Sequence, residues 1–480
     1  MNSLLSRGLL ASLLLLHMAT ALPESNFDEL PNLGDASGQI ISPEQDRAMG
    51  ASFMRQLRQA GIVLNDAETT GYVDALGRRL VARSENPGQD FTFFMVNDSS
   101  INAFAGPGGY IGINTGLLMA AETESELAGV MAHEIAHVTQ RHLARGFEAS
   151  DRMTGPRLAA MAAALLIGTQ DAGAGAAAFT AASAASLQYQ INFTRANEKE
   201  ADRIGIQSLA NAGFDPEGMS GFFERLQQNS RLYGARAPEY LSTHPVTTNR
   251  ISEAQSRAQS YPKAHLEPNL EFQLLQVKLR VSSYKNPSQV LADIYRYKGE
   301  AGGDTLVERY EFALLLETSK KYAEASKIIG QLHEDDPNRI TYRLALARVL
   351  YKGKQVKPAL DMYASSLKLY PNSLMVVLPY ATTLLSTDQA ETAFELLADS
   401  SNRHPFNPEV YNLLARAAGA TNRKVQTHTA MSQYFFLNGY TKQAIEQLQL
   451  AEKQPGLSNY QASLIQEGIK NLEASMGEKN

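Results

Sequence analysis

The spacing of hydrophobic and polar residues divides the chain into two zones. Up to about residue 261, helical spacing alternates with short runs that are rich in aromatic and branched side chains, as is typical of strands. The pattern predicts helices over residues 44–61, 66–83 and 125–146, and strands over residues 91–96, 102–105 and 110–113. From about residue 267 the spacing is helical to the end. We therefore expect a mainly α-helical protein with one small β-sheet.

The second zone repeats with a period of 34 residues. Three series of prolines and alanines share this period: Pro337, Pro371 and Pro405; Ala313, Ala347, Ala381 and Ala415; Ala325, Ala359 and Ala393. Small side chains let antiparallel helices approach closely, and proline ends a helix before the next unit. The period resembles the tetratricopeptide repeat, although the characteristic Trp is absent. About four units are predicted, and a plain helical bundle is the alternative.

These zones predict two domains after a leader segment. We expect residues 22–265 to form one domain and residues 266–480 to form an α-solenoid, whose concave face is suited to binding peptides or proteins. Residues 154–186 are rich in Ala and Gly and poor in charge, so whether they are ordered stays open.

The first 21 residues have the pattern of a secretory signal peptide. Arg7 precedes a short apolar stretch, and Ala19-Thr20-Ala21 fits a small-x-small cleavage site. The stretch is shorter than the roughly 20 residues that a membrane-spanning helix needs, and a buried N-terminal helix is the alternative. No cysteine lies near the cut, which argues against a lipid anchor there. We expect cleavage near Ala21 and a location in a bacterial periplasm.

The composition of the chain excludes several kinds of functional site. The formal net charge of -6 argues against a nucleic-acid-binding protein, which would carry a strong basic surplus. The chain contains no cysteine, which excludes disulfides, iron–sulfur clusters and a thiol nucleophile. A metal site must therefore use His, Asp or Glu.

One short motif carries the remaining chemistry. Residues 133–137 read His-Glu-Ile-Ala-His, the pattern H-E-x-x-H. His133 and His137 are four residues apart, so both imidazoles project from one helix face and can bind one Zn²⁺. Glu134 can take a proton from a water at that metal. Two surface histidines on a helix are the alternative, which the apolar residues 127–131 disfavour.

A catalytic zinc site needs a third protein ligand. No histidine follows the motif at the spacing that would supply one, so the candidate is an acid on a second helix. Glu198 and Asp202 share a helix face, while Glu200 points elsewhere. In this arrangement Glu198 would bind the metal and Asp202 would accept a hydrogen bond from a ligand histidine, so both acids on that face would have a role. A solvated, charged helix start is the alternative.

These segments together resemble the M48 family of zinc metallopeptidases. The resemblance rests on residues 133–137 and 197–202, and on residues 102–109 and 114–118 before the metal helix. It implies a gluzincin-like fold, endopeptidase activity and one Zn²⁺ per chain. It also implies that His133, His137 and Glu198 bind the metal and that Glu134 is the catalytic base.

The resemblance extends to a loop further along the chain. His244 precedes a proline, and in the similar peptidases this histidine can fill the open position of the zinc and keep the enzyme latent. A loop or helix-capping histidine is the alternative. Arg250 can orient the site or stabilise an oxyanion, and a structural ion pair is the equal alternative. His142 should point off the metal face.

The order of signal peptide, M48-like domain and repeats resembles bacterial family members that act on outer-membrane β-barrel proteins. The resemblance implies a periplasmic zinc endopeptidase that degrades misassembled outer-membrane proteins and acts as a chaperone for others. Its repeats would dock on the β-barrel assembly machinery, at the periphery of the outer membrane. Two alternatives remain: a binding or chaperone protein in which the repeats do the main work, and a general periplasmic quality-control protease. No nucleic-acid partner is expected.

Overall fold

The structure is a computed structural model that describes residues 41–148, 195–233, 238–263, 267–299 and 303–477. The predicted signal peptide and the Ala- and Gly-rich stretch 154–186 lie outside the described residues. Within the described ranges, no helix is both long enough and apolar enough to cross a membrane.

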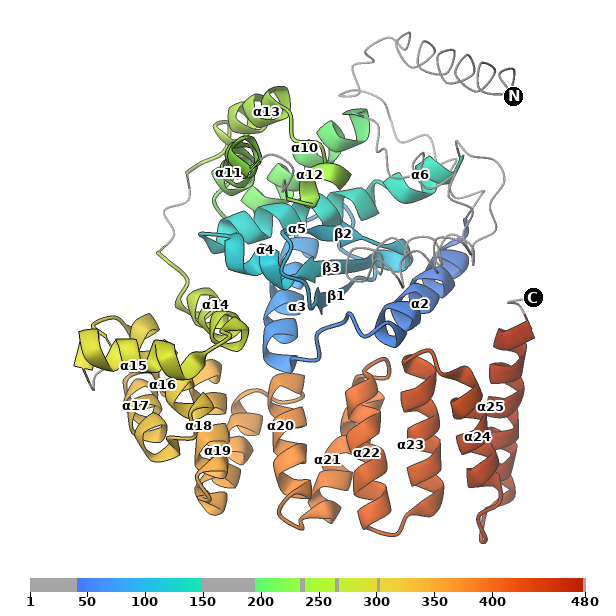
Figure 1. Cartoon of the computed structure of the whole chain (residues 1–480). Helices are drawn as coiled ribbons and strands as arrows, with labels where there is room; N and C mark the ends of the chain where they lie inside the picture. Colours follow the sequence, from blue (N-terminus) through green and yellow to red (C-terminus); the bar gives the residue numbers. More distant parts are fainter. Residues whose placement is uncertain (1–40, 149–194, 234–237, 264–266, 300–302, 478–480) are drawn as a thin grey trace, which may run out of the picture. The chain divides into compact units, whose positions relative to one another are not determined.

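The first zone forms helices around a small sheet (Figure 1). Its elements are α2 (Pro43–Gln59), α3 (Ala67–Val81), β1 (Thr92–Val96), β2 (Ala103–Ala105), a 3-10 turn (Pro107–Gly109), β3 (Tyr110–Asn114), α4 (Thr115–Ala120), α5 (Glu124–Thr139), α6 (His142–Glu148), α10 (Arg195–Asn211), α11 (Glu217–Tyr233), α12 (Tyr240–Thr243) and α13 (Thr248–Ala258). The predicted helices over 44–61 and 66–83 and the three predicted strands are confirmed. Ser42 and Asp66 cap α2 and α3 because their side chains accept backbone N–H groups of the first turn.

The sheet has the strand order β1-β3-β2. β1 pairs with β3 in parallel, and β2 pairs with β3 antiparallel, so β2 is an edge strand. The turn that joins β2 to β3 requires glycine. Gly109 has a φ of 76°, and a Cβ there would lie 2.2 Å from the carbonyl oxygen of Asp90.

Helix α5 lies between the sheet and helices α10 and α11 (Figure 1). Thr123 caps its start, and almost every residue from Ser125 to His137 is buried. The prediction of one continuous helix over 125–146 is wrong. The helix ends at Thr139, and Arg141 takes a left-handed backbone conformation with a φ of 52° before α6 begins.

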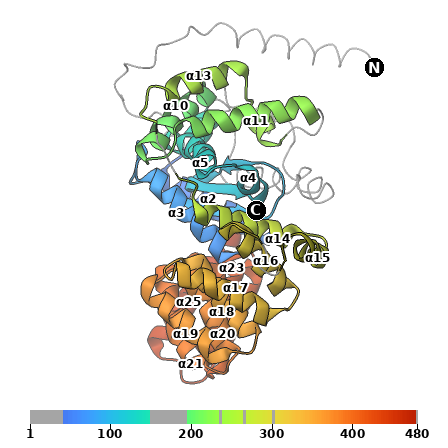
Figure 2. The same cartoon turned by 90° about the vertical axis from the view of Figure 1, so that its left-hand side faces the viewer.

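In the described part of the second zone the regular elements are all helices, and they stack in chain order (Figures 1 and 2). Its elements are α14 (Leu270–Ser283), α15 (Pro287–Lys298), α16 (Leu306–Thr318), α17 (Tyr322–Asp335), α18 (Ile340–Lys352), α19 (Val356–Leu369), α20 (Leu374–Leu385), α21 (Ala390–Arg403), α22 (Pro408–Ala420), α23 (Lys424–Leu437), α24 (Thr441–Glu452) and α25 (Asn459–Gly477). The alanines of the 34-residue series are buried between neighbouring helices, as the repeat pattern predicts.

The turns inside the repeat units also keep the period of 34. Each turn contains one residue with a positive φ at this period; in chain order they are Lys320, Lys354, Asp388, Asn422 and Gly456. From α16 to α25 the structure therefore holds five helix pairs, where the sequence predicts about four. The alanine series ends before the last pair, which looks irregular in the sequence, whereas the turn at Gly456 keeps the 34-residue register.

Helix α14 packs into two cores at once. Phe272 and Leu279 belong to the hydrophobic cluster around α5. Leu274 and Val277 belong to the cluster of the first repeats. Lys278 forms ion pairs with Asp66 and with Glu68 at the start of α3. The predicted domains 22–265 and 266–480 therefore share α14, and their boundary at residue 265 stays a proposal.

Candidate metal centre

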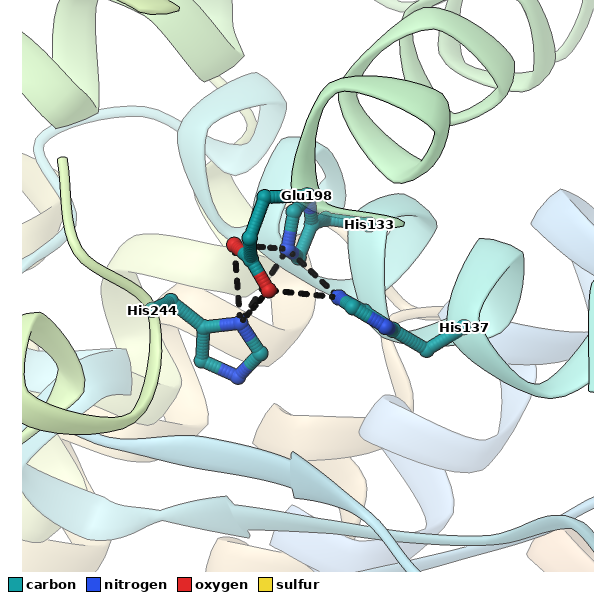
Figure 3. Close-up of side chains that lie close together, drawn as sticks. All are labelled: His133, His137, Glu198 and His244. Carbon is teal, nitrogen blue, oxygen red and sulfur yellow. Dashed lines mark hydrogen bonds and ion pairs between the residues drawn. The ribbon is translucent and has the colours of Figure 1, made fainter. Parts of the chain in front are cut away.

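Four buried side chains from three parts of the chain converge on one point (Figure 3). His133 and His137 come from α5, Glu198 from the first turn of α10, and His244 from the loop after α12. One ligand atom of each lies within 4.8 Å of the others. The structure thus brings together the three predicted metal ligands and the predicted latch residue.

The spacing of these atoms fits a single small cation. His133 Nε2 lies 2.9 Å from His137 Nε2, and the carboxylate oxygens of Glu198 lie 3.5 Å and 3.4 Å from those two nitrogens. Ligands at ~2.0–2.1 Å from a tetrahedral ion would lie about 3.3–3.4 Å from one another. Two imidazoles and one carboxylate are also a donor set that transition metals such as zinc accept.

A glycine lets α10 approach α5 closely enough to deliver Glu198. A Cβ on Gly205 would lie 3.1 Å from the backbone nitrogen of His133, closer than ordinary van der Waals contact. Glu198 and Asp202 occupy the same face of α10, one turn apart, and both are buried. The alternative of a solvated helix start does not fit this burial.

The charges of the centre favour a bound cation. Burial opposes the ionisation of Glu198, yet His244 and the two motif histidines hold its pKa well below the ordinary value. Burial also lowers the pKa of His133, but Asp202 and Glu198 outweigh it and raise that pKa to about 9. Burial lowers the pKa of His137. An ionised carboxylate at the centre of a buried cluster is the setting in which a metal ion compensates buried charge.

Glu134 lies beside the cluster without joining it. Its side chain is 1% exposed, and burial raises the pKa of its carboxyl group. Its Oε1 lies 3.5 Å from His244 Nε2, and the backbone of Ala105 on edge strand β2 contacts the carboxylate. A carboxyl group with a raised pKa, next to a metal site and an edge strand, is placed to act as a general base.

Asp202 and Arg250 support the cluster from one side. Asp202 Oδ1 lies 3.0 Å from His133 Nδ1, the ring nitrogen that faces away from the metal position. Arg250 donates two hydrogen bonds of 2.7 Å to Asp202, and its Nη1 lies 2.7 Å from Glu198. Nη1 also donates to the carbonyl of Pro245. With most of its donors engaged in this way, Arg250 fits the orienting role better than that of an oxyanion donor.

Comparison with known proteins shows the family to which the chain belongs. The model of peptidase family M48 matches residues 67–258. The beta-barrel assembly-enhancing protease of Escherichia coli (strain K12) is 34% identical, over 97% of this chain and 95% of its own. The chain belongs to peptidase family M48. The beta-barrel assembly-enhancing protease of Yersinia pestis is 33% identical over 91% of both chains. The mitochondrial metalloendopeptidase OMA1 of Arabidopsis thaliana is 32% identical over 35% of this chain and 32% of its own.

Membership of family M48 makes the chain a metallopeptidase and implies a metal ion. Within the described residues, the cluster around His133 is the group of His, Asp and Glu side chains whose spacing suits an ion. The fold expected from the sequence is confirmed, since an M48 domain with a small sheet precedes the helical repeats.

Sequence reasoning did not anticipate two contacts next to the cluster. Tyr240 is fully buried, and its ring stacks on His244 at a centroid distance of 4.7 Å. His142 stays off the metal face, as expected, but its Nδ1 lies 2.8 Å from His137 Nδ1. Helical spacing could not predict either contact. Tyr240 lies in α12, which is remote in sequence from the motif, and His142 reaches His137 only because the helix breaks at Arg141.

Proposed function

We propose that the chain is a zinc endopeptidase in which His133, His137 and Glu198 hold one Zn²⁺ per chain. The observation that carries this proposal is the convergence of these three donors beside Glu134 in a member of family M48. When bound, the zinc would polarise the scissile carbonyl group and lower the pKa of a water molecule.

The chain's own residues supply the remaining chemistry. Glu134 takes the proton of the attacking water on its carboxylate and passes it to the leaving amine. Edge strand β2 lies beside Glu134 and offers backbone N–H and C=O groups, so it can hold an extended peptide by strand addition. Asp202 and Arg250 keep His133 and Glu198 in their binding orientations.

We propose that His244 is a latch. Its Nδ1 lies 3.3 Å from His133 Nε2 and 3.1 Å from a Glu198 oxygen, so it occupies the fourth corner around the cluster. Its Nε2 faces Glu134. A histidine in this place both fills the open metal position and covers the base. Opening needs only a movement of the loop between α12 and α13.

The proposed location is the periplasm, and the proposed substrates are outer-membrane β-barrel proteins that fail to assemble. The support is the sequence pattern of the first 21 residues and the near full-length similarity to proteases named for β-barrel assembly. The repeats from α16 to α25 supply a surface on which such substrates, or the assembly machinery, can dock.

Two variants test the proposal. Glu134→Gln should keep one zinc per chain, measured by elemental analysis, and lose cleavage of an unfolded model protein. Glu198→Ala should lose zinc and cleavage together, since it removes a ligand. Glu253→Gln serves as the control, because Glu253 is a half-buried acid that pairs with Lys199 and is not one of the clustered side chains. Zinc retained in full by Glu198→Ala would move the ligand assignment to another acid.

A chaperone function is the second candidate, and the position of His244 favours it, because a closed site leaves the repeats as the active surface. Glu134→Gln separates the two functions in cells. Assembly of outer-membrane proteins that persists in this variant would belong to the repeats. Assembly that fails as badly as in a strain without the protein would require proteolysis.

A further inference from the structure

A hydrogen-bonded chain leads from the second motif histidine to the surface. His137 Nδ1 lies 2.8 Å from His142 Nδ1, and His142 Nε2 lies 2.9 Å from Glu200 Oε2. Arg145 donates to the same Glu200 oxygen from 3.1 Å. The side chain of His142 is 0% exposed, while Glu200 and Arg145 are partly exposed at 27% and 39%.

The acceptor at the surface end of this series of hydrogen bonds determines which ring nitrogen of each histidine carries a proton. Glu200 is ionised beside an arginine and can only accept, so His142 Nε2 must carry a proton. When the ring of His142 is neutral, its Nδ1 carries a lone pair that can accept a hydrogen bond from His137 Nδ1, 2.8 Å away. His137 must therefore carry its proton on Nδ1, which leaves the lone pair of Nε2 pointing at Glu198 and His133. This is the tautomer that a metal ligand needs.

The backbone is bent to make this contact. α5 ends at Thr139, and Arg141 adopts a left-handed conformation with a φ of 52°, which is unfavourable for a residue with a Cβ. The bend turns the chain so that α6 begins with His142 facing back toward His137. A continuous helix would carry His142 around to another face, because five residues correspond to about 500° of rotation. An unfavourable backbone conformation at this point suits a functional contact.

We propose that His142 is a positioning residue that fixes the tautomer and orientation of His137, with Glu200 and Arg145 as its supports. The two motif histidines are then held in parallel ways, His133 by Asp202 and Arg250 and His137 through one additional imidazole. The inference rests on the proposed metal site. Partners of this kind typically contribute 10–100-fold to metal affinity.

The experiment measures zinc affinity by competition with a chromophoric chelator for the full chain. His142→Leu should raise the dissociation constant about 10–100-fold. His142→Asn places an amide oxygen near the Nδ1 position and should lie closer to the parent chain than His142→Gln, which places its amide near Nε2. Lys199→Ala is the control, because Lys199 is a partly exposed neighbour of Glu200 on α10.

A second readout reports the tautomer directly. In zinc-loaded protein with ¹⁵N-labelled histidine, the Nδ1 proton of His137 should be protected from exchange, and His142→Leu should remove this protection. If His142→Leu does not fold, the Asn and Gln variants decide, and equal affinities in the two would overturn the proposal. Unchanged affinity and protection in a folded His142→Leu would also overturn it. His133→Ala, which lacks a proposed ligand, is the reference for absent binding. If the parent chain bound no more zinc than this variant, the proposed metal site itself would be refuted.

Discussion

Replacing Arg250 with Met tests whether the site is held by a buried ion network. The side chains of Arg250, Asp202 and Glu198 are 5%, 7% and 3% exposed. Met keeps much of the aliphatic volume but removes a guanidinium group that contacts both carboxylates at 2.7 Å. Removal of one partner from a buried pair costs about 3–5 kcal/mol, because the other charge stays buried and uncompensated.

The assay is thermal unfolding of chelator-treated protein. With about 2–4 °C for each kcal/mol in a domain of this size, the midpoint of Arg250→Met should fall by about 6–20 °C. Excess zinc should restore part of the loss, because the ion supplies positive charge to Glu198. The unfolding midpoint of Arg250→Lys should lie between those of the parent and Arg250→Met. An ammonium group keeps the charge but cannot donate two parallel hydrogen bonds to one carboxylate.

The matched control is Arg257→Met on the same helix. Arg257 forms a partly exposed pair with Glu253, and such pairs contribute about 0–1 kcal/mol. An unchanged midpoint in Arg250→Met, together with lost cleavage, would refute the structural reasoning and assign Arg250 to oxyanion stabilisation instead.

Two further predictions concern the latch and the shared helix. His244→Ala should raise cleavage of unfolded proteins and self-cleavage while zinc stays bound, and lower activity in a folded variant would show that His244 is not a latch. Lys278→Met should lower the free energy of unfolding by about 3 kcal/mol at pH 7. Burial opposes ionisation of Asp66, yet Lys278 lowers its pKa below 3.8, so this stabilisation is present above that pH and is lost on acidification. The difference in unfolding midpoint between parent and variant should therefore shrink below about pH 4, and a constant difference would contradict the ion pair.

The features that the sequence determined are local ones. The i, i+4 spacing of His133 and His137 needs only one turn of helix to create a pair of ligands. The helices and strands of the first zone follow from periodicity and from caps such as Ser42 and Asp66. The repeat pattern is local as well, because each unit packs against its neighbours in the chain.

The tertiary structure decided what depends on contacts between distant residues. The sequence could not decide between Glu198 as a ligand and a solvated acid, because only the packing of α10 on α5 at Gly205 buries it against the two histidines. It also could not show that the helix breaks at Arg141, since nothing in the local pattern marks a left-handed arginine. That break places His142 against His137. Helical periodicity describes one element at a time, whereas the surroundings of a metal ligand are set by where several elements meet.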